Sequence, residues 1–255
     1  MTRVPLVAAN WKMHLLAAEA RAFCAALRAA LPVEGAEVAI FPSFPLLPAA
    51  AEALAGSDVG LGGQDLHPEP SGAHTGDVSG AQLADAGCDW VLVGHSERRR
   101  DHGEDDERVA AKLRAATRDG LRPVLCLGET AEERRGGSTF AVLSRQLRAA
   151  IPHLGEGVVA YEPVWAIGTG ETATPQQAQE AHAFLRREAA ERIGPAAGRL
   201  RLLYGGSVKP GNAAELAAQP DVDGFLVGGA SLDVAGFLAI IRACGAAAAA
   251  TGGMP

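Results

Sequence analysis

The sequence has few aromatic residues, few cysteines and no long apolar run. Aromatic residues make up 5% of the 255 residues, so a large core has to be built from aliphatic side chains. The four cysteines lie far apart and show neither a Cys-x-x-Cys pair nor a Cys/His ligand spacing. This is typical of reduced, buried thiols rather than of a disulfide or zinc scaffold. No segment reaches the roughly 18 apolar residues of a membrane-spanning helix.

Positive charge is also in short supply. The formal net charge is −7, so no overall basic field favours nucleic acid or an anionic membrane surface. An anionic ligand would have to be held by a local arrangement of groups. The apolar stretch Val4–Ala9 is interrupted by Pro5 and is too short for the apolar region of a signal peptide. We therefore expect a cytoplasmic protein with no nucleic-acid or membrane partner.

Short apolar runs alternate with amphipathic segments rich in Ala, Leu and Arg. The runs are continuous, as parallel strands covered on both faces are; they are Pro5–Ala9, Val38–Phe41, Val59–Leu61, Trp90–Val93, Pro123–Leu127, Val158–Tyr161, Arg201–Tyr204 and Gly224–Val227. The helical segments between them include Ala17–Ala30, Val109–Arg118, Phe140–Ala150, Pro175–Ile193 and Asn212–Ala218. This order predicts a single-domain (β/α)8 TIM barrel over residues 1–245, with a doubly wound open sheet as the competing α/β layout. Residues 246–255 are expected to form a disordered C-terminal tail.

Polar residues directly follow the predicted strands. The C-terminal ends of barrel strands form one rim, and barrel enzymes assemble their sites on it. These residues are therefore candidates for one site: Asn10, Lys12, Gln64, Asp65, His95, Glu97, Glu129, Glu162, Ser207, Gly228 and Gly229.

The segment after Glu162 has the features of a lid. Pro163 stiffens one end, and Gly168 and Gly170 permit unusual dihedral angles at the other. The residues between them are too apolar for an ordinary solvent-exposed loop, which favours closure over a ligand with exclusion of water. The alternative is a surface loop whose Trp165 packs on a neighbouring helix.

Two glycine-rich turns follow the last two predicted strands. Gly205-Gly206-Ser207 and Gly228-Gly229 each stand between a strand and a helical segment. In barrels, backbone N–H groups at this place hold phosphate. Each glycine pair alone is more often a tight turn, but the two together would supply the local positive potential that the net charge lacks.

His95 and Lys12 each have a structural and a functional interpretation. A lone histidine is more often structural, but Ser96 and Glu97 predict a helix start whose dipole would lower the pKa of His95 and keep its ring neutral. A lysine after a strand is normally a solvated amine, yet beside an anionic substrate it would stabilise negative charge on oxygen. A carboxylate, an imidazole and an ammonium on one rim would provide the base, the electrophile and the charge that an enolisation needs.

Several motifs at these positions resemble the triosephosphate isomerase family. They occur in family order and cover nearly the whole chain: Asn10–Met13, Gly94–Arg99, Cys126–Thr130, Ala160–Gly170, Tyr204–Val208 and Asp223–Ser231. The resemblance implies an aldose–ketose isomerase that interconverts dihydroxyacetone phosphate and D-glyceraldehyde 3-phosphate in glycolysis and gluconeogenesis. It implies no metal and no cofactor, because the proton moves between carbons of one substrate.

The resemblance also implies roles for individual residues. Glu162 would be the base that moves the proton, His95 would polarise the carbonyl, and Lys12 would balance the enediolate and phosphate charge. Asn10 would orient the substrate, and Glu97 would hold Lys12 in place. Under a closed lid, the phosphate would be bound by backbone N–H groups of Gly168, Ser207, Gly228 and Gly229.

Members of this family commonly form homodimers by inserting the loop after the third strand into the partner. Here Thr75 would be the residue that reaches the partner's site region. The sequence departs from the frequent family pattern at Asp65 and His14, where Asn is common, and at His74, where Tyr or Phe is common. None of these departures removes a catalytic residue, but they bear on the strength and pH dependence of the dimer. The sequence does not separate a dimer from a tetramer.

Three other functions are weighed against the triose assignment. A member of the same family acting on a four-carbon ketose phosphate would keep the catalytic residues and differ only in pocket size. A non-catalytic phosphate-binding barrel would lack at least one of Lys12, His95 and Glu162, and all three are present. A barrel enzyme of tryptophan biosynthesis would share the phosphate turns but not the lid. The intact Gly228-Gly229 pair and the full lid favour the triose.

Overall fold

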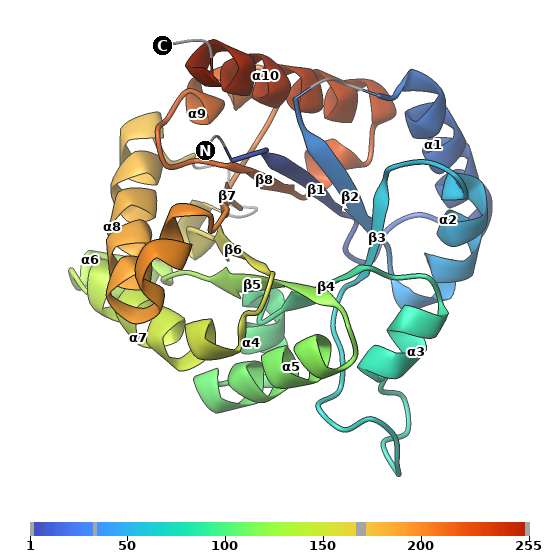
Figure 1. Ribbon diagram of the computed structural model, residues 1–255, viewed down its shortest axis with the longest axis horizontal. Coiled ribbons are helices and arrows are strands. Elements are labelled where there is room, and N and C mark those ends of the chain that lie inside the picture. Colours follow the sequence, from blue (N-terminus) through green and yellow to red (C-terminus); the bar gives the residue numbers. More distant parts are fainter. Residues whose placement is uncertain (1–2, 33–34, 167–171, 253–255) are drawn as a thin grey trace.

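Eight parallel strands form the centre of the molecule. The computed structural model describes residues 3–32, 35–166 and 172–252. The strands close into one barrel in sequence order, with β1 hydrogen-bonded to both β2 and β8 (Figure 1). They are β1 (Leu6–Asn10), β2 (Glu37–Phe41), β3 (Gly60–Gly63), β4 (Trp90–Val93), β5 (Arg122–Leu127), β6 (Val158–Tyr161), β7 (Leu202–Tyr204) and β8 (Gly224–Val227). The closed order confirms the predicted (β/α)8 barrel and rules out the open sheet.

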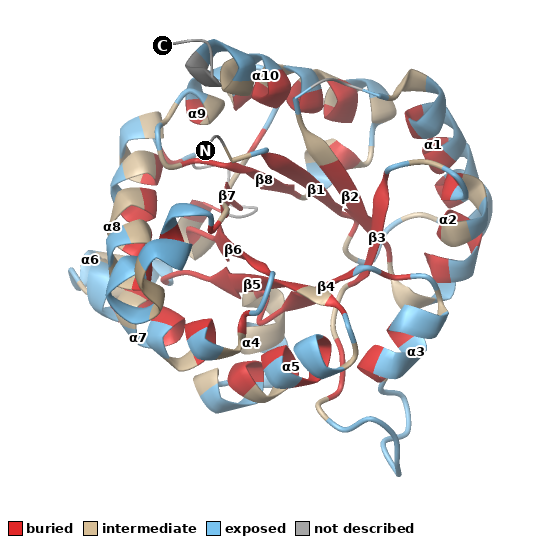
Figure 2. Cartoon of the chain, viewed as in Figure 1, coloured by how far each residue is buried: buried red, intermediate tan, exposed pale blue. Residues whose placement is uncertain are grey.

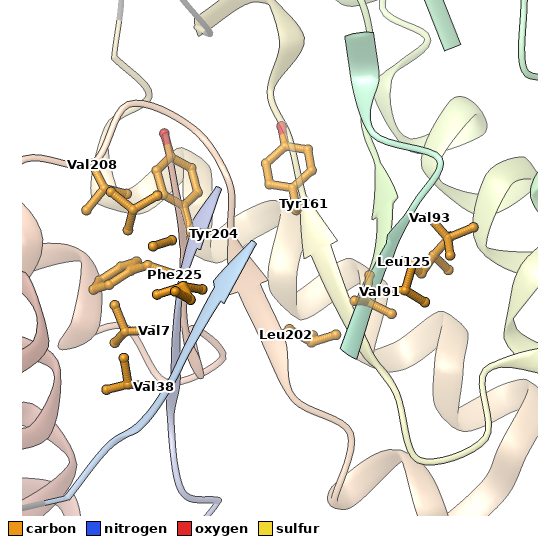
Figure 3. Close-up of a cluster of buried hydrophobic side chains, with 14 of the residues drawn as sticks. Val7, Val38, Val91, Val93, Leu125, Tyr161, Leu202, Tyr204, Val208 and Phe225 are labelled. Atoms are coloured by element: carbon orange, nitrogen blue, oxygen red, sulfur yellow. The ribbon is translucent and has the colours of Figure 1, made fainter. Parts of the chain in front are cut away.

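Both faces of each strand are buried (Figure 2). Because successive side chains of a strand point to opposite faces, alternate residues form two separate apolar clusters. In β6, Val158 and Ala160 belong to the inner cluster, whereas Val159 and Tyr161 belong to the outer one. Figure 3 shows part of the outer cluster, with Tyr161 and Tyr204 at the ends to which the strand arrows of β6 and β7 point. The continuous apolar runs therefore correctly predicted strands that are buried on both faces.

Strand β3 begins one residue later and ends two residues later than its apolar residues suggested. The prediction ended at Leu61, whereas β3 runs from Gly60 to Gly63. Glycines have low β-propensity, so a strand made largely of glycines is difficult to recognise from its sequence. Here they make room inside the barrel, because a Cβ at Gly62 would lie 2.4 Å from Cε1 of Phe41.

The helices form a ring around the barrel (Figure 1). The longer helices bury one stripe each; α1, for example, buries Ala20, Phe23, Cys24 and Leu27, whereas the short helices α4 and α6 have no buried residue. The described helices are α1 (Ala17–Ala30), α2 (Leu47–Leu54), α3 (Gly80–Asp85), α4 (Ser96–His102), α5 (Asp106–Arg118), α6 (Ala131–Arg135), α7 (Thr139–Ala150), α8 (Pro175–Ile193), α9 (Ala213–Ala217) and α10 (Val234–Gly252). None of these described helices is long and apolar enough to cross a membrane.

The last helix continues past the boundary expected at residue 245. Helix α10 runs to Gly252, so residues 246–252, expected in a disordered tail, belong to the last helix of the barrel. The reason is local, since Ala246–Ala250 is a run of the residue with the highest helix propensity.

All four cysteines are free and buried, as their spacing predicted. Burial raises the pKa of the thiols of Cys24, Cys88 and Cys244 to about 12. Thiols with such a high pKa are almost entirely protonated at neutral pH, so they are unreactive packing groups.

Candidate active site

Most of the candidate residues at the strand ends line one cavity of about 530 Å³, whereas Gln64, Asp65 and Glu129 do not. The predicted site residues that line it are Asn10, Lys12, His95, Glu97, Glu162, Ser207, Gly228 and Gly229. Gly168 lies outside the described residues. The parallel order of the strands explains this convergence, because residues far apart in sequence leave the sheet at the same end.

Glu162 is placed by the end of β6 and held by the start of α4. It is 2% exposed, and its Oε1 lies 2.9 Å from Nε2 of His95. The backbone N–H of Ser96 donates to Oε2 at 2.8 Å. Burial raises the pKa of Glu162, but the charge and hydrogen bond of His95, together with the Ser96 N–H, lower it below its ordinary value overall. The carboxylate is therefore ionised and able to accept a proton.

Gly128, at the end of β5, allows the chain to approach Glu162 closely. A Cβ on Gly128 would lie 1.7 Å from the Glu162 carbonyl oxygen, a separation that no side chain can accommodate. The position of the base thus depends on the absence of a side chain on the neighbouring strand.

His95 caps α4 with its ring. Its Nδ1 accepts a hydrogen bond from the Glu97 N–H at 3.2 Å, so in the neutral ring the proton lies on Nε2, facing Glu162. Burial lowers the pKa of His95, but the Glu162 carboxylate raises it, and the net direction is upward. This differs from the lowered pKa expected from the helix dipole, and the physical reason is the Glu162 carboxylate in direct contact with the ring. Moving Glu162 away from the ring would remove the main cause of the rise.

Lys12 sits next to the glycine turn after β8. Its Nζ lies 2.6 Å from Oε1 of Glu97, and a Cβ on Gly228 would be 3.5 Å from Cε of Lys12. The Lys12 backbone has φ 51°, a left-handed conformation that costs a non-glycine residue about 1–3 kcal/mol. Hydrogen bonds of the Lys12 N–H to Asn10 Oδ1 and of Gln64 Nε2 to the Lys12 carbonyl hold it there. The ammonium is thus fixed beside the turn that would receive an anion.

The arrangement therefore places a carboxylate, an imidazole and an ammonium on the wall of one cavity. Two comparisons with known proteins agree with it. The family model described as triosephosphate isomerase matches residues 5–244. The chain belongs to the triosephosphate isomerase family.

Its relatives are similar over almost their full length. The triosephosphate isomerase of Symbiobacterium thermophilum is 54% identical, covering 97% of this chain and 98% of the relative. That of Moorella thermoacetica is 51% identical, over 94% and 98%, and that of Thermus thermophilus is 49% identical, over 96% and 100%. The chain is accordingly an isomerase of this type.

The start of the expected lid, Val164–Ala166, is anchored to Glu129. This residue is fully buried; its Oε1 accepts a hydrogen bond from Trp165 Nε1 at 2.9 Å and pairs with Arg134 at 3.3 Å. Its carbonyl oxygen also accepts the Val164 N–H at 3.2 Å. Sequence reasoning placed Glu129 on the rim but gave it no role, because nothing in its own motif shows which residues its carboxylate meets.

Trp165 agrees in part with both interpretations of this segment, a lid and a surface loop whose Trp165 packs on a neighbouring helix. Its ring lies 4.1 Å below the guanidinium of Arg134, so it does pack on the neighbouring helix α6. Its indole N–H bond to Glu129, however, ties the 3-10 turn Val164–Ala166 to the end of β5. The rest of the expected lid, residues 167–171, lies outside the described residues.

The loop between β3 and α3 projects away from the barrel (Figure 1). Thr75 is exposed on it and does not line the catalytic cavity of its own chain. At the base of the loop, Asp65 binds Nζ of Lys112 at 2.5 Å and pairs with Arg98 at 2.8 Å. Glu104 pairs with the same two cations, so the unusual Asp65 enters a balanced cluster. His14 lines the catalytic cavity.

Proposed function

We propose that the isomerase interconverts dihydroxyacetone phosphate and D-glyceraldehyde 3-phosphate by proton transfer through an enediolate, serving glycolysis and gluconeogenesis. The observation that carries the proposal is the buried, ionised carboxylate of Glu162, 2.9 Å from Nε2 of His95, on the wall of a cavity that Lys12 also lines. A carbonyl substrate between these groups would meet a base and a hydrogen-bond donor at once.

The proton transfer follows from these groups. The Glu162 carboxylate removes a proton from the carbon next to the carbonyl, while the Nε2–H of neutral His95 donates to the carbonyl oxygen. His95 then regains a proton from the neighbouring hydroxyl, and Glu162 returns its proton to the second carbon. Lys12 stabilises the negative charge on the oxygens, and Asn10 orients them. Acid–base groups of this kind contribute about 10²–10⁴-fold each to a rate.

The phosphate would bind at the glycine turns after β7 and β8. Backbone N–H groups of Ser207, Gly228 and Gly229 supply donors, with Gly168 of the lid as a further proposed donor. A 3-10 turn starts at Gly229, and the Lys12 ammonium adjoins it. Closure of the lid would exclude water and suppress loss of phosphate from the enediolate. The proton transfer itself needs no metal or cofactor.

We propose that the working form is a homodimer in the cytoplasm, in which Thr75 reaches the partner's site region. The projection of its loop away from the barrel supports this contact.

A coupled assay tests the substrate and the base together. Wild type and Glu162→Gln would be compared on glyceraldehyde 3-phosphate and on erythrulose phosphates. We expect turnover of the triose to exceed that of the four-carbon sugar, and Glu162→Gln to lose most of it while remaining folded. Equal or better turnover of the four-carbon substrate would contradict the triose assignment. Unchanged turnover in Glu162→Gln would contradict the role of Glu162 as the base.

A further inference from the structure

The loop between β3 and α3 carries a cluster of side chains that the isomerase chemistry does not use. His67, His74 and Asp77 each offer one metal-ligand atom, and these atoms lie within 4.8 Å of one another. His67 Nε2 is 3.8 Å from Asp77 Oδ2, and the two imidazole rings are stacked with centroids 3.8 Å apart. In the described part of the chain, no other three His, Cys, Asp or Glu side chains form such a group.

The loop's own main chain brings the three residues together. His67, on the outgoing limb, donates its backbone N–H to Val78 of the returning limb at 2.7 Å. Asp77 donates its backbone N–H to the His74 carbonyl at 3.0 Å. His67 is 9% exposed, whereas the other two side chains are exposed. One ligand is therefore fixed, and two are free to adjust around an ion.

The surroundings favour a cation. The cluster lines a cavity of about 600 Å³, separate from the catalytic one, that is also lined by Glu69 and Asp85. No Lys or Arg is among the described residues that line it. Two arginines lie nearby, since Arg108 acts to lower the pKa of His67 and Arg118 donates to the Pro68 carbonyl at 3.0 Å. The three carboxylates that line the cavity outnumber them, so the local environment still attracts positive charge.

We propose that His67, His74 and Asp77 bind one divalent transition-metal ion per chain, with Zn²⁺ as the preferred ion. Two imidazole nitrogens and a carboxylate oxygen are a common zinc donor set, and water would complete the tetrahedron. Bonds of roughly 2.1 Å place tetrahedral ligand atoms about 3.4 Å apart. The side chains of His74 and Asp77 therefore have to move inward by up to about 1.4 Å. The His74 ring also has to turn out of its stack on His67, so that the lone pairs in both ring planes aim at the ion, and its exposure allows this.

Binding also sets the tautomer of His67. Its Nδ1 accepts the Glu69 N–H at 3.1 Å, so in the neutral ring the proton is on Nε2. A metal ion at Nε2 requires that proton to pass through water to Nδ1, with no net release from the ring. The Glu69 N–H then turns to solvent, which the exposed position of Glu69 permits.

The ion would clamp the loop rather than take part in isomerisation. It would join the outgoing limb, the tip and the returning limb on either side of Thr75. All three ligands belong to one chain, and in the proposed dimer the loop that carries them would lie against the partner. His74, the departure from the aromatic residue common in the family, supplies the ligand that completes the group.

Metal titration of tag-free protein tests the site. Zn²⁺ binding would be followed by calorimetry, and Co²⁺ binding by the visible absorption of a tetrahedral ion, in wild type and His74→Phe. Phenylalanine keeps a ring that can stack on His67 but removes the ligand atom. The matched control is His102→Phe, since His102 is exposed at the far end of α4. Isomerase turnover reports folding in every variant.

We expect one ion per chain in wild type and in His102→Phe. His74→Phe should weaken binding by at least about 10-fold, the lower end of the loss seen even when groups behind a ligand are removed, with turnover unchanged. Asp77→Asn should weaken binding as well and serves if His74→Phe does not fold. The proposal is overturned if wild type binds no ion at micromolar Zn²⁺, or if a folded ligand variant binds as tightly as wild type.

Discussion

The catalytic rim and the loop between β3 and α3 use the same residue types in opposite ways. On the rim, Glu162 and His95 are 2% and 6% exposed, and each is held by a backbone N–H from the first residues of α4. On the loop, His74 and Asp77 are exposed, and the His74 ring stacks on His67. Burial with fixed donors sets the orientation and pKa that proton transfer needs. Exposure leaves side chains free to close around an ion or a partner.

The rim should tolerate no change in its imidazole. His95→Gln should lower kcat by about 10²–10⁴-fold, because the side-chain amide cannot exchange a proton with the substrate oxygens. The thermal midpoint should stay close to that of wild type. His102→Gln, on the exposed end of the same helix, should keep full turnover in the same coupled assay. A loss of less than 10-fold in His95→Gln would remove His95 from the mechanism.

The rim should also be sensitive to the backbone behind it. Gly128→Ala would press a methyl group onto the Glu162 carbonyl and displace the base, and a shift of about 1 Å can cost about 10²-fold. Steady-state kinetics should show the loss in kcat/KM. Gly136→Ala is the control, since a Cβ there meets nothing closer than 3.5 Å. Equal kinetics for the two variants would show that the close approach at Gly128 does not position Glu162.

The lid anchor should have an intermediate effect. Glu129→Gln keeps an acceptor for Trp165 but removes the charge that pairs with Arg134. The loss of one hydrogen bond to a charged group, about 1.5 kcal/mol, corresponds to a kcat lower by roughly 10-fold if the anchor is needed in the closed state. Glu132→Gln, at an exposed position of α6, should have no effect. Unchanged turnover in Glu129→Gln would make the anchor purely structural.

The base of the loop should affect stability rather than chemistry. The pKa of Asp65 is raised because burial and the neighbouring Glu104 carboxylate outweigh its contacts with Lys112 and Arg98. The folded state therefore favours the protonated carboxyl of Asp65. Its stabilising contribution to the free energy of unfolding is complete below the pKa of the unfolded state, and it is lost as the pH rises through the pKa of the folded state. Asp65→Asn should then be more stable than wild type at pH 7, and the gain should shrink toward pH 4.

Urea unfolding at both pH values measures this difference, with the exposed Asp85→Asn as control. Turnover should stay within about 2-fold of wild type, since Asp65 does not line the catalytic cavity. If Asp65→Asn is less stable than wild type at pH 7, the pKa of Asp65 is not raised by folding, and the prediction is wrong.

Sequence patterns located the strands well where they are strongly apolar. The runs predicted for β4, β6 and β8 coincide with the strands, because a strand buried on both faces has no polar positions to interrupt it. Two predicted boundaries were wrong because of local composition. The end of β3 was placed too early because its last residues are glycines, which make room for Phe41. The end of α10 was also placed too early, because an alanine run continues the helix. The role of Glu129 was not predictable, since its partners Trp165 and Arg134 are recognisable only once β5, α6 and the lid are placed.

The sequence by itself determined the order of strands and helices, and it named the chemical groups that the rim would carry. Those features follow from local propensity, from periodicity and from motifs within a few residues. Only the tertiary structure decided that His95 has its pKa raised rather than lowered, because that sign depends on a carboxylate 67 positions away in the chain and 2.9 Å away in space. It also decided that His67, His74 and Asp77 meet, because the loop's main-chain bonds set their distances.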